Sequence, residues 1–247
     1  MSNWTTVTEF LLLGFSDTRE LQILHFVIFL AAYLAALVGN LLVITVVTTD
    51  HHLHSPMYYF LVNLSILDLG TISVIVPKSM ANSLLNTRTI SYAGCVSQVF
   101  LFVLCCAADL AFLTIMAYDR YVAICKPLHY EIIMNRRACV QMAAGCWAAG
   151  VMYSALHTGN TFSLPFCHSN IINQFFCEIP QLLKLSCSGT YRRELAALVC
   201  LGLVCFVFIV VSLVVGAEES SEINWTRAKE LGRRRLNVTQ KMRKLPQ

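Results

Sequence analysis

Long apolar segments alternate with short polar ones along most of this chain. Five segments are nearly free of charged side chains and reach about 20 residues or more, the length that an α-helix needs to cross a hydrocarbon core of about 30 Å. They are residues 23–47, 57–76, 96–117, 138–157 and 195–215. Backbone groups in lipid must form hydrogen bonds within their own segment, and these runs lack the strict alternation of barrel strands. The pattern therefore predicts an all-α membrane protein with five spanning helices.

The composition supports lipid as the solvent of these segments. Hydrophobic residues make up 57% of the chain and charged residues 13%, whereas soluble domains carry about 25% charged residues. The apolar run at residues 10–15 is too short for a signal peptide and follows Glu9 rather than a basic region. We therefore expect the first span to insert the chain, and we consider a large soluble helical core the weaker alternative.

Basic residues indicate how the chain crosses the membrane. With residues 1–22 outside, twelve Lys and Arg residues lie on the inner side and six on the outer side, as the positive-inside rule requires. This orientation places the long loop 158–194 outside and the basic tail 216–247 in the cytoplasm. The tail could rest on anionic lipid, or it could be sequence without an evolved partner.

Two acids fall within the predicted spans. Asp68 lies eleven residues after Met57, and Asp109 lies eleven residues before Arg120, so each is about 16 Å from the inner face. A carboxylate at this depth is costly and normally faces the bundle interior. The two acids could share a sodium ion or a proton, or neighbouring hydroxyls and amides could satisfy each of them.

The third span has one face with three zones. Its inner end carries the charged pair Asp119 and Arg120, and its middle carries Asp109. Its outer zone is apolar and consists of Phe102, Val103, Cys106 and Ala107. This zone predicts either a pocket for small apolar ligands or ordinary packing between helices. On spacing alone, the charged pair could be a solvated ion pair that contributes little.

Four of the eleven cysteines fall on the expected outer side. They are Cys95, Cys167, Cys177 and Cys187. An even number of cysteines in an oxidising compartment predicts disulfides. Four thiols allow three pairings, and spacing alone does not choose among them.

Several long strings are specific to one family. They are "GN" at residues 39–40, "LHSPMYYFLVNLSILDL" at 53–69 and "MAYDRYVAICKPLHY" at 116–130, together with Trp147 and the outer cysteines. Over residues 1 to about 212 the chain resembles the olfactory receptors, a branch of the rhodopsin-like G-protein-coupled receptors. The resemblance implies a bundle of the seven-helix type, of which this chain would contain five helices.

The resemblance also implies roles for single residues. Phe102, Val103, Cys106 and Ala107 would contact a small hydrophobic odorant, and Asp68 with Asp109 would form the buried acid pair near a sodium site. Asp119 would restrain Arg120 until a heterotrimeric G protein binds. The implied disulfides are Cys95–Cys177 and Cys167–Cys187, and Asn3 would carry a glycan. These are expectations from the family alone.

The chain departs from the family pattern after Ser212. Leu213 stands where family members have tyrosine, and neither the opening motif of the sixth helix nor another spanning apolar run follows. We therefore expect an odorant receptor that is truncated after its fifth helix and deficient in coupling to a stimulatory G protein. The alternative is a non-signalling membrane protein that stays in the endoplasmic reticulum or associates with full-length receptors.

Other classes of function find little support in the sequence. We find no nucleophile with a matching base, so we do not expect an enzyme. The histidines of "HHLH" at residues 51–54 lack an identifiable fourth ligand, so we expect no metal site. We also expect no nucleic-acid partner, and we place the multi-pass chain in the plasma membrane with its N-terminus outside.

Overall fold

The computed structural model describes most of the chain up to Ser186. The described residues are 8–13, 18–50, 53, 55–85, 88–166 and 170–186, followed by the helical residues 196, 199, 202, 203, 207, 210 and 211.

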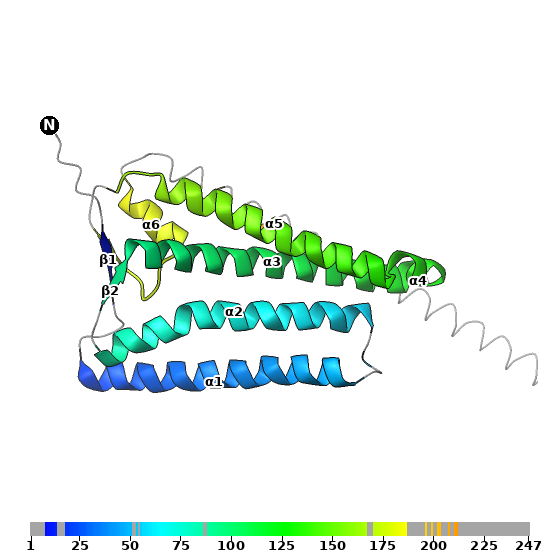
Figure 1. The fold of residues 1–247 in the computed structure, drawn as a ribbon, viewed down its shortest axis with the longest axis horizontal. Coiled ribbons are helices and arrows are strands. Elements are labelled where there is room, and N and C mark those ends of the chain that lie inside the picture. Colours follow the sequence, from blue (N-terminus) through cyan, green and yellow to red (C-terminus); the bar gives the residue numbers. More distant parts are fainter. Residues whose placement is uncertain are drawn as a thin grey trace, which may run out of the picture.

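Four long helices form the body of the molecule (Figure 1). They are α1 (Arg19–Thr49), α2 (Pro56–Leu85), α3 (Tyr92–Cys125) and α5 (Arg136–Phe162). Each is long and apolar enough to cross a membrane, and at 1.5 Å per residue each exceeds a core of about 30 Å. Four of the five predicted spans are therefore confirmed. Most of the fifth lies outside the described residues, although those described between 196 and 211 are helical.

The helices are longer than the apolar runs that predicted them. The second span was expected to end at residue 76, but α2 continues to Leu85 with Pro77 inside it. Proline removes one backbone hydrogen bond and favours a bend, and Figure 1 shows α2 bending toward its outer end. Polar side chains fix two helix starts, since Ser91 accepts from the Gly94 amide of α3 and Asn135 from the Ala138 amide of α5.

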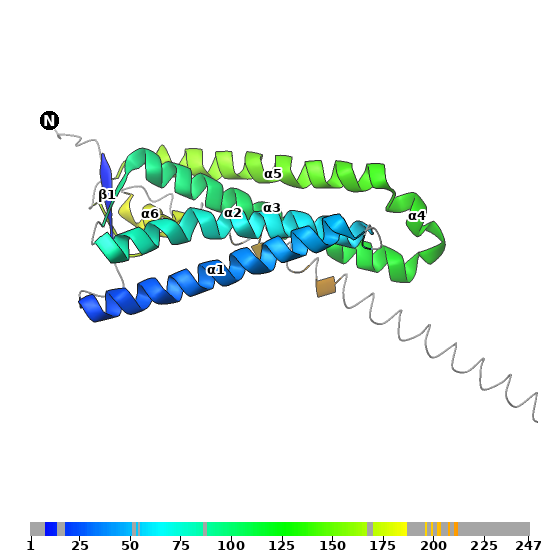
Figure 2. The ribbon, with the colours of Figure 1, turned by 60° about the horizontal axis from the view of Figure 1, so that its bottom comes forward.

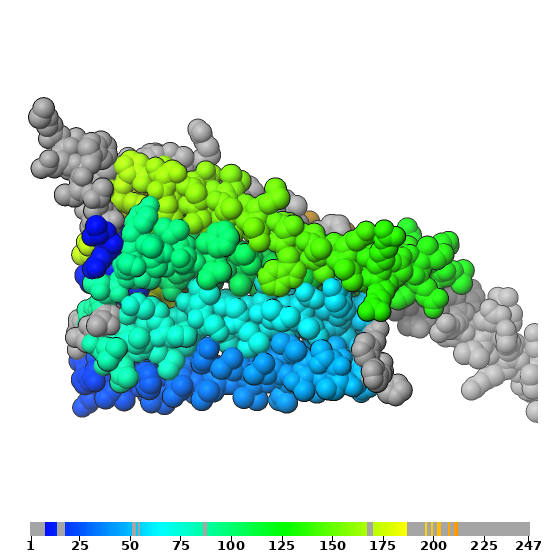
Figure 3. Space-filling view, in the orientation of Figure 1, coloured from blue at the N-terminus to red at the C-terminus, as the bar shows by residue number. Residues whose placement is uncertain are grey.

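Neighbouring helices pack in sequence order. Helix α1 lies along α2, α2 contacts α3, and α3 contacts α5, and the space-filling view shows α1 and α2 side by side over their length (Figure 3). Large apolar residues on the outer face of α1, such as Val38 and Leu42, are more than half exposed. In a membrane protein this is the surface that lipid covers.

The outer end of the bundle carries a small sheet that the sequence did not predict. Its strand order is β2 (Thr89–Ser91), β1 (Glu9–Leu12) and β3 (Ile171–Ile172). The segment 1–22, expected only as an extracellular N-terminus, thus contributes the central strand. A short helix, α6 (Ile179–Leu185), follows β3 at the same end, while the 3₁₀ turn η2 (Pro127–His129) and α4 (Tyr130–Ile133) lie at the inner end. Figure 2 shows β1 and α6 together, opposite α4.

Two buried clusters hold these parts together. The outer cluster joins Phe10 and Leu12 of β1 to Val99 of α3 and to Leu182 and Leu183 of α6. The inner cluster joins α2, α3 and α5 and includes Phe60, Phe112, Val122, Met134 and Cys146. The candidate site lies between α3 and α5, below the outer cluster.

Candidate functional site

A cavity of about 550 Å³ lies between the outer halves of α3 and α5. All four residues that the sequence proposed for ligand contact line it: Phe102, Val103, Cys106 and Ala107. They lie on one face of α3 because they recur at steps of three and four residues, which matches the helical period. This face of α3 therefore borders a cavity, and contact of these residues with a ligand stays a prediction.

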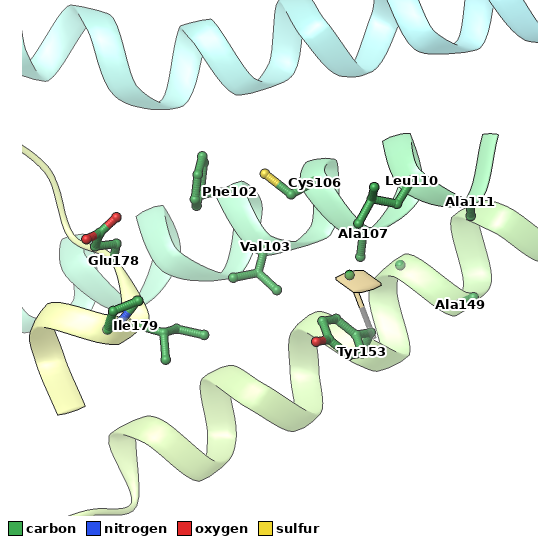
Figure 4. A pocket seen from close by; sticks show the side chains of 13 residues that line it. Phe102, Val103, Cys106, Ala107, Leu110, Ala111, Ala149, Tyr153, Glu178 and Ile179 are labelled. Atoms are coloured by element: carbon green, nitrogen blue, oxygen red, sulfur yellow. The ribbon is translucent and has the colours of Figure 1, made fainter. Parts of the chain in front are cut away.

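The opposite wall comes from parts of the chain that the sequence analysis did not connect with α3. Ala149, Gly150 and Tyr153 of α5 line the cavity, together with Gly202. Figure 4 shows Tyr153 on α5 across the cavity from α3. Helix packing brings these residues together, so no local pattern in the sequence identifies them.

The long outer loop covers the remaining end of the cavity. Glu178, Ile179 and Pro180 line it there, beside the start of α6 (Figure 4). Burial raises the pKa of the Glu178 carboxyl above its usual range, and a hydrogen bond from Gln174 and the charge of Lys184 partly offset this effect. Most residues that line the cavity are apolar, and Tyr153 and Glu178 are the lining residues with a hydroxyl or carboxyl group.

A disulfide fixes this loop to α3. Cys95 at the outer end of α3 is bonded to Cys177, 82 residues away, with their Cα atoms 5.6 Å apart. Beside it the Cys177 amide donates to Gln98 Oε1 at 2.8 Å, and Gln98 Nε2 donates to the Val74 carbonyl at 3.0 Å. The expected Cys95–Cys177 pair is thus present in the structure. The disulfide and the two Gln98 hydrogen bonds therefore link the outer loop, α3 and α2 at one place.

The two membrane acids occupy different surroundings. Asp109 is half-buried, and its Oδ1 atom is buried with no hydrogen-bond partner. Asp68 on α2 is close enough for its charge to act on Asp109, but its side chain is exposed. The two acids are thus near each other but differ in burial, and a shared sodium ion or proton stays a prediction.

The charged pair at the inner end of α3 takes separate partners. The Asp119 carboxylate is 3% exposed and accepts a hydrogen bond from the Tyr130 hydroxyl at 2.8 Å. Arg120 is exposed, and its Nη2 atom donates to Met57 Sδ at 3.1 Å. Adjacent helix residues point in different directions, so within the described residues the expected restraint of Arg120 is limited to its charge attraction to Asp119.

The segment that follows α3 at the inner end exposes apolar side chains. Leu128 of η2 is 92% exposed and Ile132 of α4 is 71% exposed, and both line a shallow hollow with Lys126 and His129. Exposed apolar residues grouped with basic ones are typical of a surface that binds another protein. The string at residues 116–130 carries the family resemblance, but no pattern in it predicts that Leu128 is exposed.

Three of the expected sites fall outside the described residues. They are the glycan acceptor Asn3 and the second disulfide pair, Cys167 and Cys187. The flanking residues Phe166 and Ser186 do form an antiparallel bridge. The Cys167–Cys187 pairing and the glycan therefore stay predictions.

Comparison with known proteins gives a consistent result. Residues 39–244 match the family model described as "7 transmembrane receptor (rhodopsin family)". The human protein "Olfactory receptor 14C36" is 56% identical over 217 residues, which is 87% of this chain and 70% of that protein. The human "Olfactory receptor 14A16" is 52% identical with the same coverage, and "Olfactory receptor 14J1" is 53% identical over 79% of this chain and 61% of its own length.

Proposed function

Because this chain belongs to the olfactory receptors within the rhodopsin family of seven-transmembrane receptors, we propose that it binds small, largely apolar odorants in the cavity between α3 and α5. It is a multi-pass membrane protein, and the members of its family are receptors rather than enzymes. Plasma-membrane location with the N-terminus outside is part of the same proposal. The observation that carries the proposal is the cavity itself.

The size and lining of the cavity suit such ligands. Its volume of about 550 Å³ falls within the range of about 300–1,000 Å³ that holds small molecules. Most of its lining is aliphatic or aromatic, so the binding free energy would come mainly from apolar burial, at about 25 cal/mol per Å². The Tyr153 hydroxyl and the Glu178 carboxyl would orient a ligand that carries one hydroxyl or carbonyl group.

A substitution that fills the cavity tests whether odorants bind there. Volatile alcohols, esters and ketones are screened for their ability to raise the melting temperature of purified residues 1–247 in lipid nanodiscs. We expect Ala107→Trp, which fills the cavity, to abolish the shift that the best compound gives. The control Ala123→Trp changes an exposed residue of the same helix and should retain the shift. Equal responses of the two variants would remove this cavity as the binding site.

The inner face supports the second half of the proposal, coupling to a stimulatory G protein. Arg120 is exposed near the inner end of α3, and Leu128 and Ile132 of the following η2 and α4 segments are also exposed. A cation next to an apolar patch offers a partner both a charged contact and an apolar anchor. We assign these three residues to the coupling surface.

A sodium ion is the cofactor that the family implies, and the local chemistry fits it. Carboxylate oxygens are the ligands that hard cations prefer, and Asp109 Oδ1 is buried without a partner in the described structure. Asp109 and Asp68 would hold the ion, whose charge would offset their repulsion. Sodium should then raise the melting temperature more than potassium does, and Asp109→Asn should remove the difference; no ion preference in the unmodified chain would contradict the assignment.

One observation favours a second candidate function. Asp68 is exposed in the polypeptide of residues 1–247 although it lies in a membrane-spanning helix, and an uncovered carboxylate in lipid is costly. Such a chain could be a non-signalling membrane protein that is retained in the endoplasmic reticulum or covers this face by associating with full-length receptors.

Odorant-evoked cAMP distinguishes the two candidates. Cells expressing residues 1–247 are compared with cells expressing "Olfactory receptor 14C36" at matched surface density. A response above empty vector supports signalling by this chain. No response, with retention inside the cell or co-precipitation with the relative, supports the second candidate.

A further inference from the structure

The amino-terminal strand β1 is bonded on both of its edges. On one side it pairs with β2, and the Leu12 amide donates to the Arg88 carbonyl at 2.7 Å. On the other side it pairs with β3, and the amides of Leu11 and Leu13 donate to the carbonyls of Asn170 and Ile172. Within the described part of the chain β2 and β3 do not pair with each other, and the sheet connects these two segments, about 80 residues apart in sequence, through the central strand β1.

The side chains of β1 alternate between the interior and the outer surface, as the period of a strand requires. Phe10 is 0% exposed and Leu12 is 1% exposed, whereas Glu9 is exposed and Leu11 is half-buried. The Phe10 ring contacts the rings of Tyr92 and Phe166, with centroids 6.1 and 5.7 Å away. Full burial of a side chain of this size contributes about 1.5–3 kcal/mol, so β1 is held by packing as well as by backbone bonds.

The cluster that contains Phe10 and Leu12 shares residues with the cavity wall. Ile179 belongs to this buried cluster and also lines the cavity, and Val103 packs against the cluster from the cavity side. The loop residues that cover the cavity, such as Ile179, therefore lie between the cavity and the cluster that contains β1. A change in the packing of Phe10 or Leu12 alters the buried cluster to which Ile179 belongs.

The disulfide alone does not define the position of this loop. It holds the loop at Cys177 only, whereas the residues that cover the cavity come after this point. Within the described residues the loop is also held by the Cys177–Gln98 hydrogen bond and, at the far end of α6, by the Phe166–Ser186 bridge. Between these points the buried cluster under β1 holds Ile179, Leu182 and Leu183 by packing.

We propose that β1 closes the outer end of the cavity, and that Phe10 and Leu12 are positioning residues that hold Ile179 over the ligand space. The proposal rests on the proposed function in taking this cavity as the ligand site. Leu12 and Phe10 do not touch the ligand; they determine whether the cavity is closed to water at its outer end.

Cys106 provides a reporter of closure, because it lines the cavity below Ile179. Residues 1–247 are reconstituted in nanodiscs and treated with a charged, water-soluble maleimide that does not enter lipid. Labelling that disappears in Cys106→Ser is assigned to Cys106. Its rate measures how often water reaches the cavity, and no odorant is needed.

Leu12→Ala and Leu11→Ala form a matched pair on opposite faces of one strand. We expect Leu12→Ala and Phe10→Ala to raise the Cys106 labelling rate at least tenfold, and Leu11→Ala to leave it within twofold. Leu12→Val removes a single methylene and should give an intermediate rate, which covers the case in which the alanine variant fails to fold. Equal rates for Leu11→Ala and either Leu12 variant would overturn the proposal, as would fast labelling of the unmodified protein.

This outcome is independent of the binding test. If no compound shifts the melting temperature but the β1 variants change the Cys106 labelling rate as expected, β1 closes the cavity and the odorant function fails. If compounds bind but the β1 variants leave the labelling rate unchanged, the closure by β1 is wrong while the odorant function stands.

Discussion

At the scale of single residues, Asp119 is the one acidic side chain that is buried in the described part of the chain. Its carboxylate depends on the hydrogen bond from Tyr130. Removing the donor leaves a buried charged acceptor unsatisfied, which costs about 1–3 kcal/mol. We therefore expect Tyr130→Phe to lower the melting temperature in detergent. The matched control Tyr118→Phe changes a more exposed tyrosine, and equal losses would show that the bond contributes little.

Glu178 should make the thermal stability of the protein depend on pH. Its pKa is raised in the folded protein, chiefly by burial, so folding disfavours the ionised carboxylate. The stabilising contribution of the neutral form is complete below the pKa of an unfolded glutamate, about 4.3, and is lost as the pH rises through the folded pKa. Glu178→Gln should therefore match the wild type at low pH and be more stable than the wild type at pH 7.

Melting temperatures measured from pH 4 to pH 8 test this expectation. The control Glu9→Gln changes an exposed acid of β1 at the same end of the bundle, and its melting temperatures should match those of the wild type at each pH. A constant difference between Glu178→Gln and the wild type at every pH would contradict the assigned cause.

The sequence predicted some functional residues and missed others for a simple reason. Phe102, Val103 and Cys106 share one helix face, and helical period alone places them together. Tyr153 and Glu178 reach the cavity only through tertiary packing, so no local pattern identifies them. Tyr130 as the partner of Asp119 and Met57 as the partner of Arg120 also come from tertiary packing, and the restraint of Arg120 by Asp119 stays a prediction.

At the scale of elements, the approach of α3 to α5 depends on Gly150. A Cβ atom at this position would lie 3.2 Å from the Ala108 Cβ atom and 3.2 Å from the Leu104 carbonyl oxygen. Gly150→Leu should force the helices apart and destabilise the protein by about 1–3 kcal/mol. Gly145→Leu is the control, because nothing lies within 4 Å of its added Cβ on the same helix. Thermal unfolding of both variants measures the difference, and equal stabilities would show that the contact can relax.

The helices could be predicted from the sequence and the strands could not. Each spanning helix forms its own hydrogen bonds, so its hydropathy is a sufficient signal. The strands have four, three and two residues, and β1 finds its partners about 80 and 160 residues away. Such short strands exist because their partners are already held by the helices and the disulfide.

At the scale of the whole molecule, the two ends of the bundle differ in chemistry. The Cys95–Cys177 disulfide, β1 and α6 share one end, and disulfides persist in oxidising compartments. The other end carries Arg120, Lys126, Arg136 and Arg137, and basic residues concentrate on the cytoplasmic side. Both arguments predict that β1 lies outside, one from covalent chemistry and the other from charge.

This orientation predicts where a glycan can be attached. Asn3, Asn224 and Asn237 each begin an Asn-X-Thr acceptor sequence, and the expected orientation, with segment 1–22 outside and the tail 216–247 in the cytoplasm, would expose only Asn3 to glycosylation. Glycosylation occurs on the luminal side, which becomes the outside of the cell, so the chain should carry one glycan. Endoglycosidase should increase its gel mobility once, Asn3→Gln should abolish that shift, and Asn224→Gln and Asn237→Gln should leave it unchanged. A glycan at Asn224 or Asn237 instead would show that the membrane orientation is inverted. The disulfide would then lie in the reducing cytoplasm, where reduced thiols at Cys95 and Cys177 would be detectable by alkylation.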